Sequence, residues 1–114
     1  TYSNGAKKSV LGVRPDTLDQ HGAVSEATVS EMAHGILGLS GADYAVAVSG
    51  IAGPSGGTDD KPVGTVWLAW AWRDGETNSL EACRYNFRGS RDEVRSQSVV
   101  IALQGLRERL RAHG

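Results

Sequence analysis

The fold is decided mainly by residues 44–57, which read Tyr-Ala-Val-Ala-Val-Ser-Gly-Ile-Ala-Gly-Pro-Ser-Gly-Gly. Its first five residues are almost continuously apolar, as expected for a strand that is buried on both faces. Glycines and prolines crowd residues 50–64, and this composition does not form regular structure. We therefore predict a central strand over residues 44–48 that leads into a functional loop, where backbone amides can approach a ligand closely.

A hairpin and a long helix are predicted after this loop. Residues 65–72 and 77–87 are strand-like, and the intervening Asp74-Gly75 is a strong hairpin signal. Ser90 and Glu93 then form a capping box, in which each side chain satisfies a free amide of the first helical turn. Apolar residues continue one helical face beyond it, namely Val94, Ile101, Leu103, Leu106 and Leu110.

Three helices are predicted before residue 44. Ser3 can cap a short helix that ends before Gly12, and Pro15 suits the start of another that ends at Gly22. Ser25 is a good N-cap for a longer third helix, which we expect to cover the sheet. Its apolar residues recur at helical spacing: Val29, Met32, Ala33, Ile36 and Leu37.

Composition limits the class of protein. The chain has 114 residues and a mass of 12.0 kDa, which fits one domain over residues 1–114. Twelve basic and thirteen acidic residues give no net field that would attract nucleic acid or an anionic membrane. The apolar run at residues 63–72 is too short to span a bilayer, so a cytoplasmic location is expected. The lone Cys83 fits a reducing compartment and excludes a cysteine-rich zinc site.

The first group of residues that could carry chemistry is Tyr2 to Lys7, at an expected strand-to-helix turn. A lysine in a partly desolvated pocket loses some preference for its charged form, so it can act as a general base toward a serine hydroxyl. The alternative is a solvated surface lysine, which is the commoner state of this residue type. Lys8 fits that alternative better than Lys7 does.

The second group is the loop itself. Ligands of open α/β sheets gather at the carboxyl ends of strands, where glycines let amides point at a phosphate or an oxyanion. A purely structural turn is the alternative, because the loop lacks the endings of a P-loop and of a dinucleotide fingerprint. The candidate binding residues are Ser49, Gly50, Ile51, Ala52, Gly53, Gly56 and Gly57.

The third group is a pair of arginines, Arg91 and Arg95, which share a face at the start of the last helix. Guanidinium groups beside a helix N-terminus suit a phosphate, whereas surface pairing with Asp92 or Glu93 is the alternative. The histidines His21, His34 and His113 are too scattered for a zinc site, so no metal is predicted.

Three tryptophans crowd one predicted strand. Trp70 and Trp72 share one face and Trp67 lies on the other, by alternation along the strand. Packing in the core or at a subunit interface is favoured over stacking on a ligand. The tryptophan-rich hairpin supports a prediction that the protein forms homo-oligomers, with a dimer favoured.

Taken in order, several segments resemble successive motifs of the CinA C-terminal domain family. They are residues 1–7, 21–26, 49–54, 61–66 and 91–95, so the resemblance runs over nearly the whole chain. The resemblance implies a CinA-like α/β fold, which we expect to be a three-layer α/β/α sandwich with a mixed sheet. It also implies hydrolysis of the carboxamide of nicotinamide mononucleotide (NMN) to nicotinic acid mononucleotide and ammonia, with no cofactor.

The same resemblance implies roles for individual residues. Lys7 matches the family's general base and Tyr2 the tyrosine beside it, while Asn4 is expected at the substrate. Ser49 stands where many relatives have threonine lining the site, and Arg91 matches an arginine of the site.

One departure from the family pattern concerns the nucleophile. The family carries a serine in an Ala-Glu-Ser-Cys-Thr-Gly-Gly-like turn, about 30 residues or fewer before the Tyr-Ser-Asn motif. Ser3, Ser9 and Ser25 lack the surrounding glycines, so we expect that the chain lacks the family's first helix and strand and is inactive alone. A non-catalytic nucleotide-binding or interaction domain is the alternative function.

Overall fold

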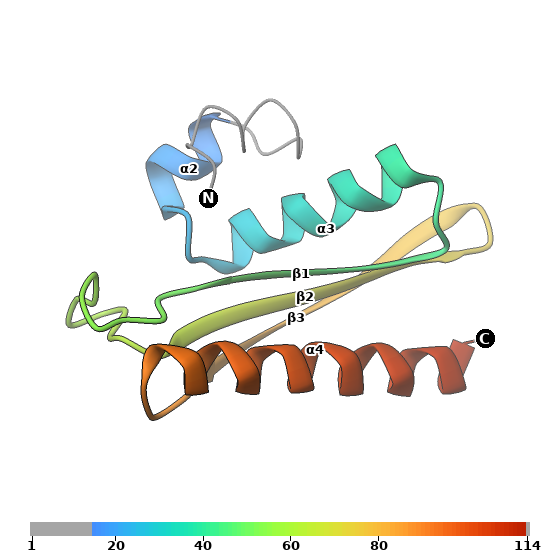
Figure 1. Cartoon of the computed structure of the whole chain (residues 1–114). Coiled ribbons are helices and arrows are strands. Elements are labelled where there is room, and N and C mark those ends of the chain that lie inside the picture. Colours follow the sequence, from blue (N-terminus) through green and yellow to red (C-terminus); the bar gives the residue numbers. More distant parts are fainter. Residues whose placement is uncertain (1–14, 114) are drawn as a thin grey trace.

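The computed structural model describes residues 15–113. Two helices, α2 (Pro15–His21) and α3 (Glu26–Ser40), precede strand β1 (Tyr44–Gly50), and the hairpin of β2 (Thr65–Asp74) and β3 (Thr77–Asn86) precedes helix α4 (Arg91–His113). Helix α3 covers one face of the sheet and α4 the other (Figure 1). The predicted α/β class and its three layers are confirmed.

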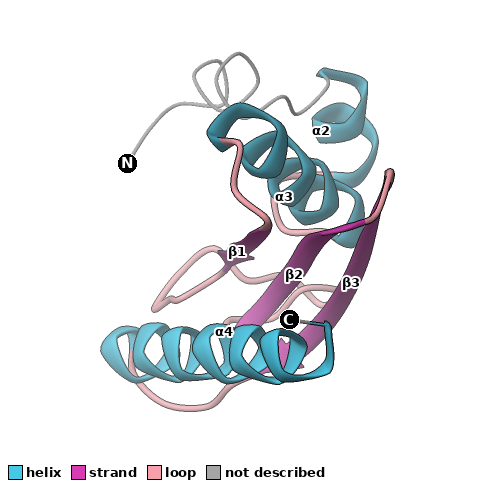
Figure 2. Ribbon diagram, turned by 90° about the vertical axis from the view of Figure 1, so that its right-hand side faces the viewer, coloured by secondary structure: helices cyan, strands magenta, loops and turns pink. Residues whose placement is uncertain are grey.

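Residues 15–113 form three strands in the order β1-β2-β3, and both neighbouring pairs are antiparallel (Figure 2). The chain reverses in the loop after β1 and in the turn after β2, which makes both pairs antiparallel. Within this part of the chain β2 pairs with both neighbours, and β1, the predicted central strand, pairs with β2 alone. The mixed sheet and the central position of residues 44–48 concern the whole chain and stay predictions.

Helix α3 packs closely on the sheet because small side chains face it. Its residues Val29, Ala33 and Leu37 are fully buried against a sheet face whose buried residues are alanines of β1 and β2. Ser25 caps the helix as predicted, since its hydroxyl accepts a hydrogen bond from the Thr28 amide. Gly41 ends it in the left-handed conformation, with φ of 68°.

Helix α4 packs on a face that large side chains dominate. Val66, Leu68, Trp70 and Trp72 of β2 point toward it, whereas Trp67 belongs to the α3 face, as the alternation predicted. Trp70 is 2% exposed, and its indole nitrogen donates to the Ala102 carbonyl at 3.1 Å. Core packing of Trp70 and Trp72 is therefore confirmed, so neither supplies a surface for self-association.

The start of α4 is fixed by the predicted capping box. The Ser90 amide donates to Glu93 Oε1 at 2.9 Å, and the Glu93 amide donates to Ser90 Oγ at 3.2 Å. No helix within residues 15–113 is both long and apolar enough to cross a membrane.

Candidate functional site

The segments in which the sequence predicted a binding site lie together at one end of the molecule. The last residues of β1, the loop after it, the connection between α2 and α3, and the first turn of α4 lie together there (Figure 1). Both α3 and α4 begin at this end. Since the free amides of a helix N-terminus carry partial positive charge, this end favours anions.

The base of the glycine-rich loop is held by backbone hydrogen bonds. The Ile51 amide donates to the Thr65 carbonyl at 2.9 Å, and the Gly64 amide donates to the Ile51 carbonyl at 2.7 Å. At Gly64, φ is 95° and a Cβ atom would lie 2.0 Å from the Phe87 carbonyl oxygen, so only glycine fits. Residues 54–60 at the loop tip are exposed, and a ligand can reach them.

Two side chains tie this loop and strand to the connection between α2 and α3. Lys61 Nζ donates to the His21 carbonyl at 2.8 Å, and Ser49 Oγ donates to the Ala23 carbonyl at 2.7 Å. Ser49 is only 8% exposed, so its hydroxyl positions this connection. Lys61 was missed as an individual residue, and the only signal for it was its place in one of the family-like segments.

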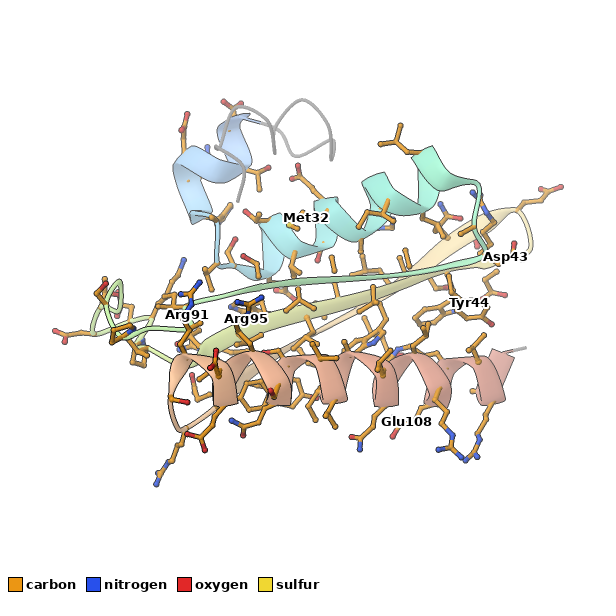
Figure 3. The ribbon with its side chains drawn as sticks, in the orientation of Figure 1. Met32, Asp43, Tyr44, Arg91, Arg95 and Glu108 are labelled. Atoms are coloured by element: carbon orange, nitrogen blue, oxygen red, sulfur yellow. The ribbon has the colours of Figure 1, made fainter. Side chains whose placement is uncertain are left out.

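Arg91 joins the start of α4 to the loop. Its Nη1 donates to the Gly53 carbonyl at 3.2 Å. The side chains of Arg91 and Arg95 both rise from the first turns of α4 toward the end of β1 (Figure 3). Within residues 15–113 neither forms an ion pair with a carboxylate, so the alternative of surface pairing is not observed.

Glu93 has a local role in the capping box. Its bond from the Ser90 amide, and secondarily its bond with the Ser90 side chain, hold the pKa of the carboxyl below its ordinary value. The Glu93 carboxylate therefore stabilises the first turn of α4.

An apolar groove adjoins this end of the molecule. It has a volume of about 300 Å³ and lies between β1 and α4, with Val48, Val94 and Val99 among its walls and Arg95 beside it. Since its lining is mainly aliphatic, the groove suits an apolar partner.

The structure places part of the predicted site together. Eight of the predicted residues lie at this end: Ser49, Gly50, Ile51, Ala52, Gly53, Gly56, Gly57 and Arg91. Tyr2, Asn4 and Lys7 lie outside the described residues. Within residues 15–113 no three His, Cys, Asp or Glu side chains gather as a metal ion would require. Loop amides, helix N-termini and guanidinium groups together suit a phosphate.

A family model and the sequence relatives of this chain point to the same family. The model of the CinA C-terminal domain matches residues 1–110. The nicotinamide-nucleotide amidohydrolase PncC of Escherichia coli K12 is 57% identical over 106 residues, which are 93% of this chain and 62% of that protein. A CinA-like protein of Thermotoga maritima is 52% identical over 96% of this chain and 26% of its own length. The chain thus spans about three fifths of the PncC relative.

Solved structures agree with the sequence relatives. The competence damage-inducible protein A of Klebsiella pneumoniae superposes with a TM-score of 0.87 at 51% identity, over 96% of this chain and 66% of that chain. The competence/damage inducible protein CihA of Agrobacterium tumefaciens gives 0.86 at 46% identity, over 93% of this chain and 63% of that chain.

Proposed function

This chain belongs to the CinA C-terminal domain family, and from this we propose that the complete protein containing it hydrolyses the carboxamide of NMN. The products are nicotinic acid mononucleotide and ammonia. The observation that carries the proposal is the contact of Arg91 with the glycine-rich loop, in a chain 57% identical to a nicotinamide-nucleotide amidohydrolase.

The described end of the molecule supports binding of a nucleotide phosphate. Arg91 uses Nη1 to hold the Gly53 carbonyl, which leaves other donors of the same guanidinium for an anion. Arg95 lies on the same side of α4, and the N-termini of α3 and α4 add partial positive charge. Because the arginines are not neutralised by carboxylates of the described residues, their charge can serve a dianionic phosphate.

The proposed chemistry is acyl transfer through a serine. A serine oxygen attacks the carboxamide carbon while Lys7 accepts the hydroxyl proton. Amides of the glycine-rich loop stabilise the oxyanion, in the role for which we propose Gly53, Gly56 and Gly57. The C–N bond then breaks, Lys7 returns the proton to the departing nitrogen, and ammonia leaves. Water hydrolyses the acyl ester to the acid and regenerates the serine.

The remaining roles follow the family resemblance. We assign Tyr2 to a place beside the base and Asn4 to contact with the substrate. The serine comes from a family-type nucleophile turn that this sequence does not contain. A homodimer in the cytoplasm stays a prediction.

Ammonia release from NMN by the complete gene product tests this function. Replacing Lys7 with alanine should lower the rate by about a hundredfold or more, because the general base is lost. Lys8→Ala is the matched control and should keep the parental rate. An active Lys7→Ala variant would contradict the mechanism. NMN binding without any ammonia release would favour the non-catalytic nucleotide-binding module.

A further inference from the structure

The glycine-rich loop, residues 50–64, depends on contacts with other elements for a fixed conformation. It contains five glycines, whose backbone has many accessible conformations, so the loop alone does not fix the direction of its amides. Arg91 of α4 donates to the Gly53 carbonyl at 3.2 Å. Arg84 of β3 donates to the Asp60 carbonyl at 3.0 Å. These two bonds attach the loop to α4 and to β3.

Lys61 attaches the loop to a third part of the molecule. Its Nζ donates at 2.8 Å to the carbonyl of His21, the last residue of α2, 40 residues away in the sequence. The last carbonyls of a helix lack intrahelical partners and carry partial negative charge, which suits an ammonium group. A short turn fixes the backbone that carries Lys61. The Thr58 amide donates to the Lys61 carbonyl at 2.9 Å, and the Lys61 amide donates to Thr58 Oγ1 at 3.0 Å.

The connection between α2 and α3 is held from its other side by buried hydroxyls. The Gly22 carbonyl accepts a hydrogen bond from Thr28 Oγ1 at 2.6 Å. The Ala23 carbonyl accepts one from Ser49 Oγ at 2.7 Å. Both donors are buried, and they belong to α3 and β1. Lys61 therefore ties the loop to a segment that is itself fixed to the fold, rather than to another free loop.

We propose that Lys61 is a positioning residue of the site, which holds the glycine-rich loop in place through its bond to the His21 carbonyl. This inference rests on the proposed function, in which amides of that loop stabilise the oxyanion. Such donors are effective when they are already in place before the reaction. The bond of Lys61 lies at the surface, where one hydrogen bond adds little to the free energy of unfolding. Its loss should therefore affect the reaction more than the fold.

Ammonia release from NMN by the complete protein tests this role. Lys61→Met removes the ammonium group and keeps an unbranched side chain. It should lower kcat by about tenfold or more, because misplaced groups stabilise the transition state poorly. The KM should stay near the parental value, because Arg91 is unchanged. Lys61→Arg keeps a donor and should restore most of the rate. Arg107→Met removes an exposed charge elsewhere on α4 and should keep the parental kcat.

Hydrogen exchange on the same proteins separates a loosened loop from a weakened fold. In Lys61→Met the Thr58 amide should exchange several-fold faster, because the turn that it closes has lost its anchor. The Gly64 amide, bonded to the Ile51 carbonyl at 2.7 Å at the base of the loop, should exchange as in the parent. Urea unfolding should give Lys61→Met nearly the parental stability.

Three results would overturn the proposal for Lys61. The first is an active parent whose kcat is unchanged in Lys61→Met. The second is a loss of kcat that Lys61→Arg does not restore, which would require the lysine amine itself. The third is equal exchange of the Thr58 amide in parent and Lys61→Met.

Failure of the proposed function would look different. A complete protein that releases no ammonia from NMN would refute that function. The exchange measurement would then decide alone whether Lys61 positions the loop, since faster exchange at Thr58 would support it and unchanged exchange would refute it.

Discussion

Replacing Gly105 with alanine sets two opposed effects against each other. In an exposed helix, alanine is more favourable than glycine by about 1 kcal/mol. Gly105 lies buried in α4, where a Cβ atom would fall 2.3 Å from Cζ2 and 2.4 Å from Cε2 of Trp70. Those separations are far inside van der Waals contact, so either α4 or the indole must move.

The cost of that movement exceeds the gain in helix propensity. Overpacking a core typically costs about 1–3 kcal/mol. Displacing Trp70 also disturbs its bond to the Ala102 carbonyl, worth about 1 kcal/mol, and its stacking under the Arg109 guanidinium, 4.1 Å from the ring centroid. After subtraction of the propensity gain, we expect Gly105→Ala to lower the free energy of unfolding by about 1–3 kcal/mol.

Urea unfolding followed by tryptophan fluorescence measures this free energy. The matched control is Gly38→Ala, because Gly38 lies exposed in α3 and a Cβ there would have nothing within 4 Å. That variant should be more stable than the parent by about 0.5–1 kcal/mol. The two substitutions should therefore have opposite signs. A Gly105→Ala variant as stable as the parent would refute the close packing of α4 on Trp70.

Two further predictions concern helix caps. Ser25→Ala should lower the free energy of unfolding by about 1–2 kcal/mol in the same assay, because the Thr28 amide and the Gly22 carbonyl both lose their bonds to the serine hydroxyl; an unchanged midpoint would contradict the cap. The pKa of Glu93 is lower in the folded state, so its contribution to stability is present above its ordinary pKa of 4.5 and is lost as pH falls through the folded value. Glu93→Gln should flatten the acid side of the stability profile, and an identical profile in parent and variant would contradict the capping box.

Much of the secondary structure could be predicted because its signals are local. Ser25 and the pair Ser90 and Glu93 marked two helix starts, and Asp74-Gly75 marked the hairpin turn. Each of these signals acts between residues close in sequence, so it can be recognised without the fold.

Strand order could not be predicted in the same way. The apolar run in β1 indicates that both faces of the strand are covered, and α3 and α4 do cover them. It carries no information about how many strands lie beside it or in which direction they run, so strand order needs the structure. Within residues 15–113 the structure adds that β2 lies between β1 and β3 and is antiparallel to both.

The proximity of some candidate site residues could be predicted from the sequence. Family-like segments pointed to Arg91 and the glycine-rich loop, and the bond from Arg91 to Gly53 joins them across 38 residues. The bonds from Lys61 to His21 and from Ser49 to Ala23 have no local sequence signal, because each partner is a backbone carbonyl that any residue offers.

The placement of the substrate at this end of the molecule is tested most directly by the KM for NMN. We compare the complete protein carrying Arg91→Met with the control variant Arg107→Met. Each variant loses one exposed guanidinium group from α4, but only Arg91 contacts the loop. A charge-assisted hydrogen bond contributes about 1.5–3 kcal/mol, so Arg91→Met should raise KM by about tenfold or more while Arg107→Met leaves it unchanged. A parental KM in Arg91→Met would contradict the placement of the substrate at this end of the molecule.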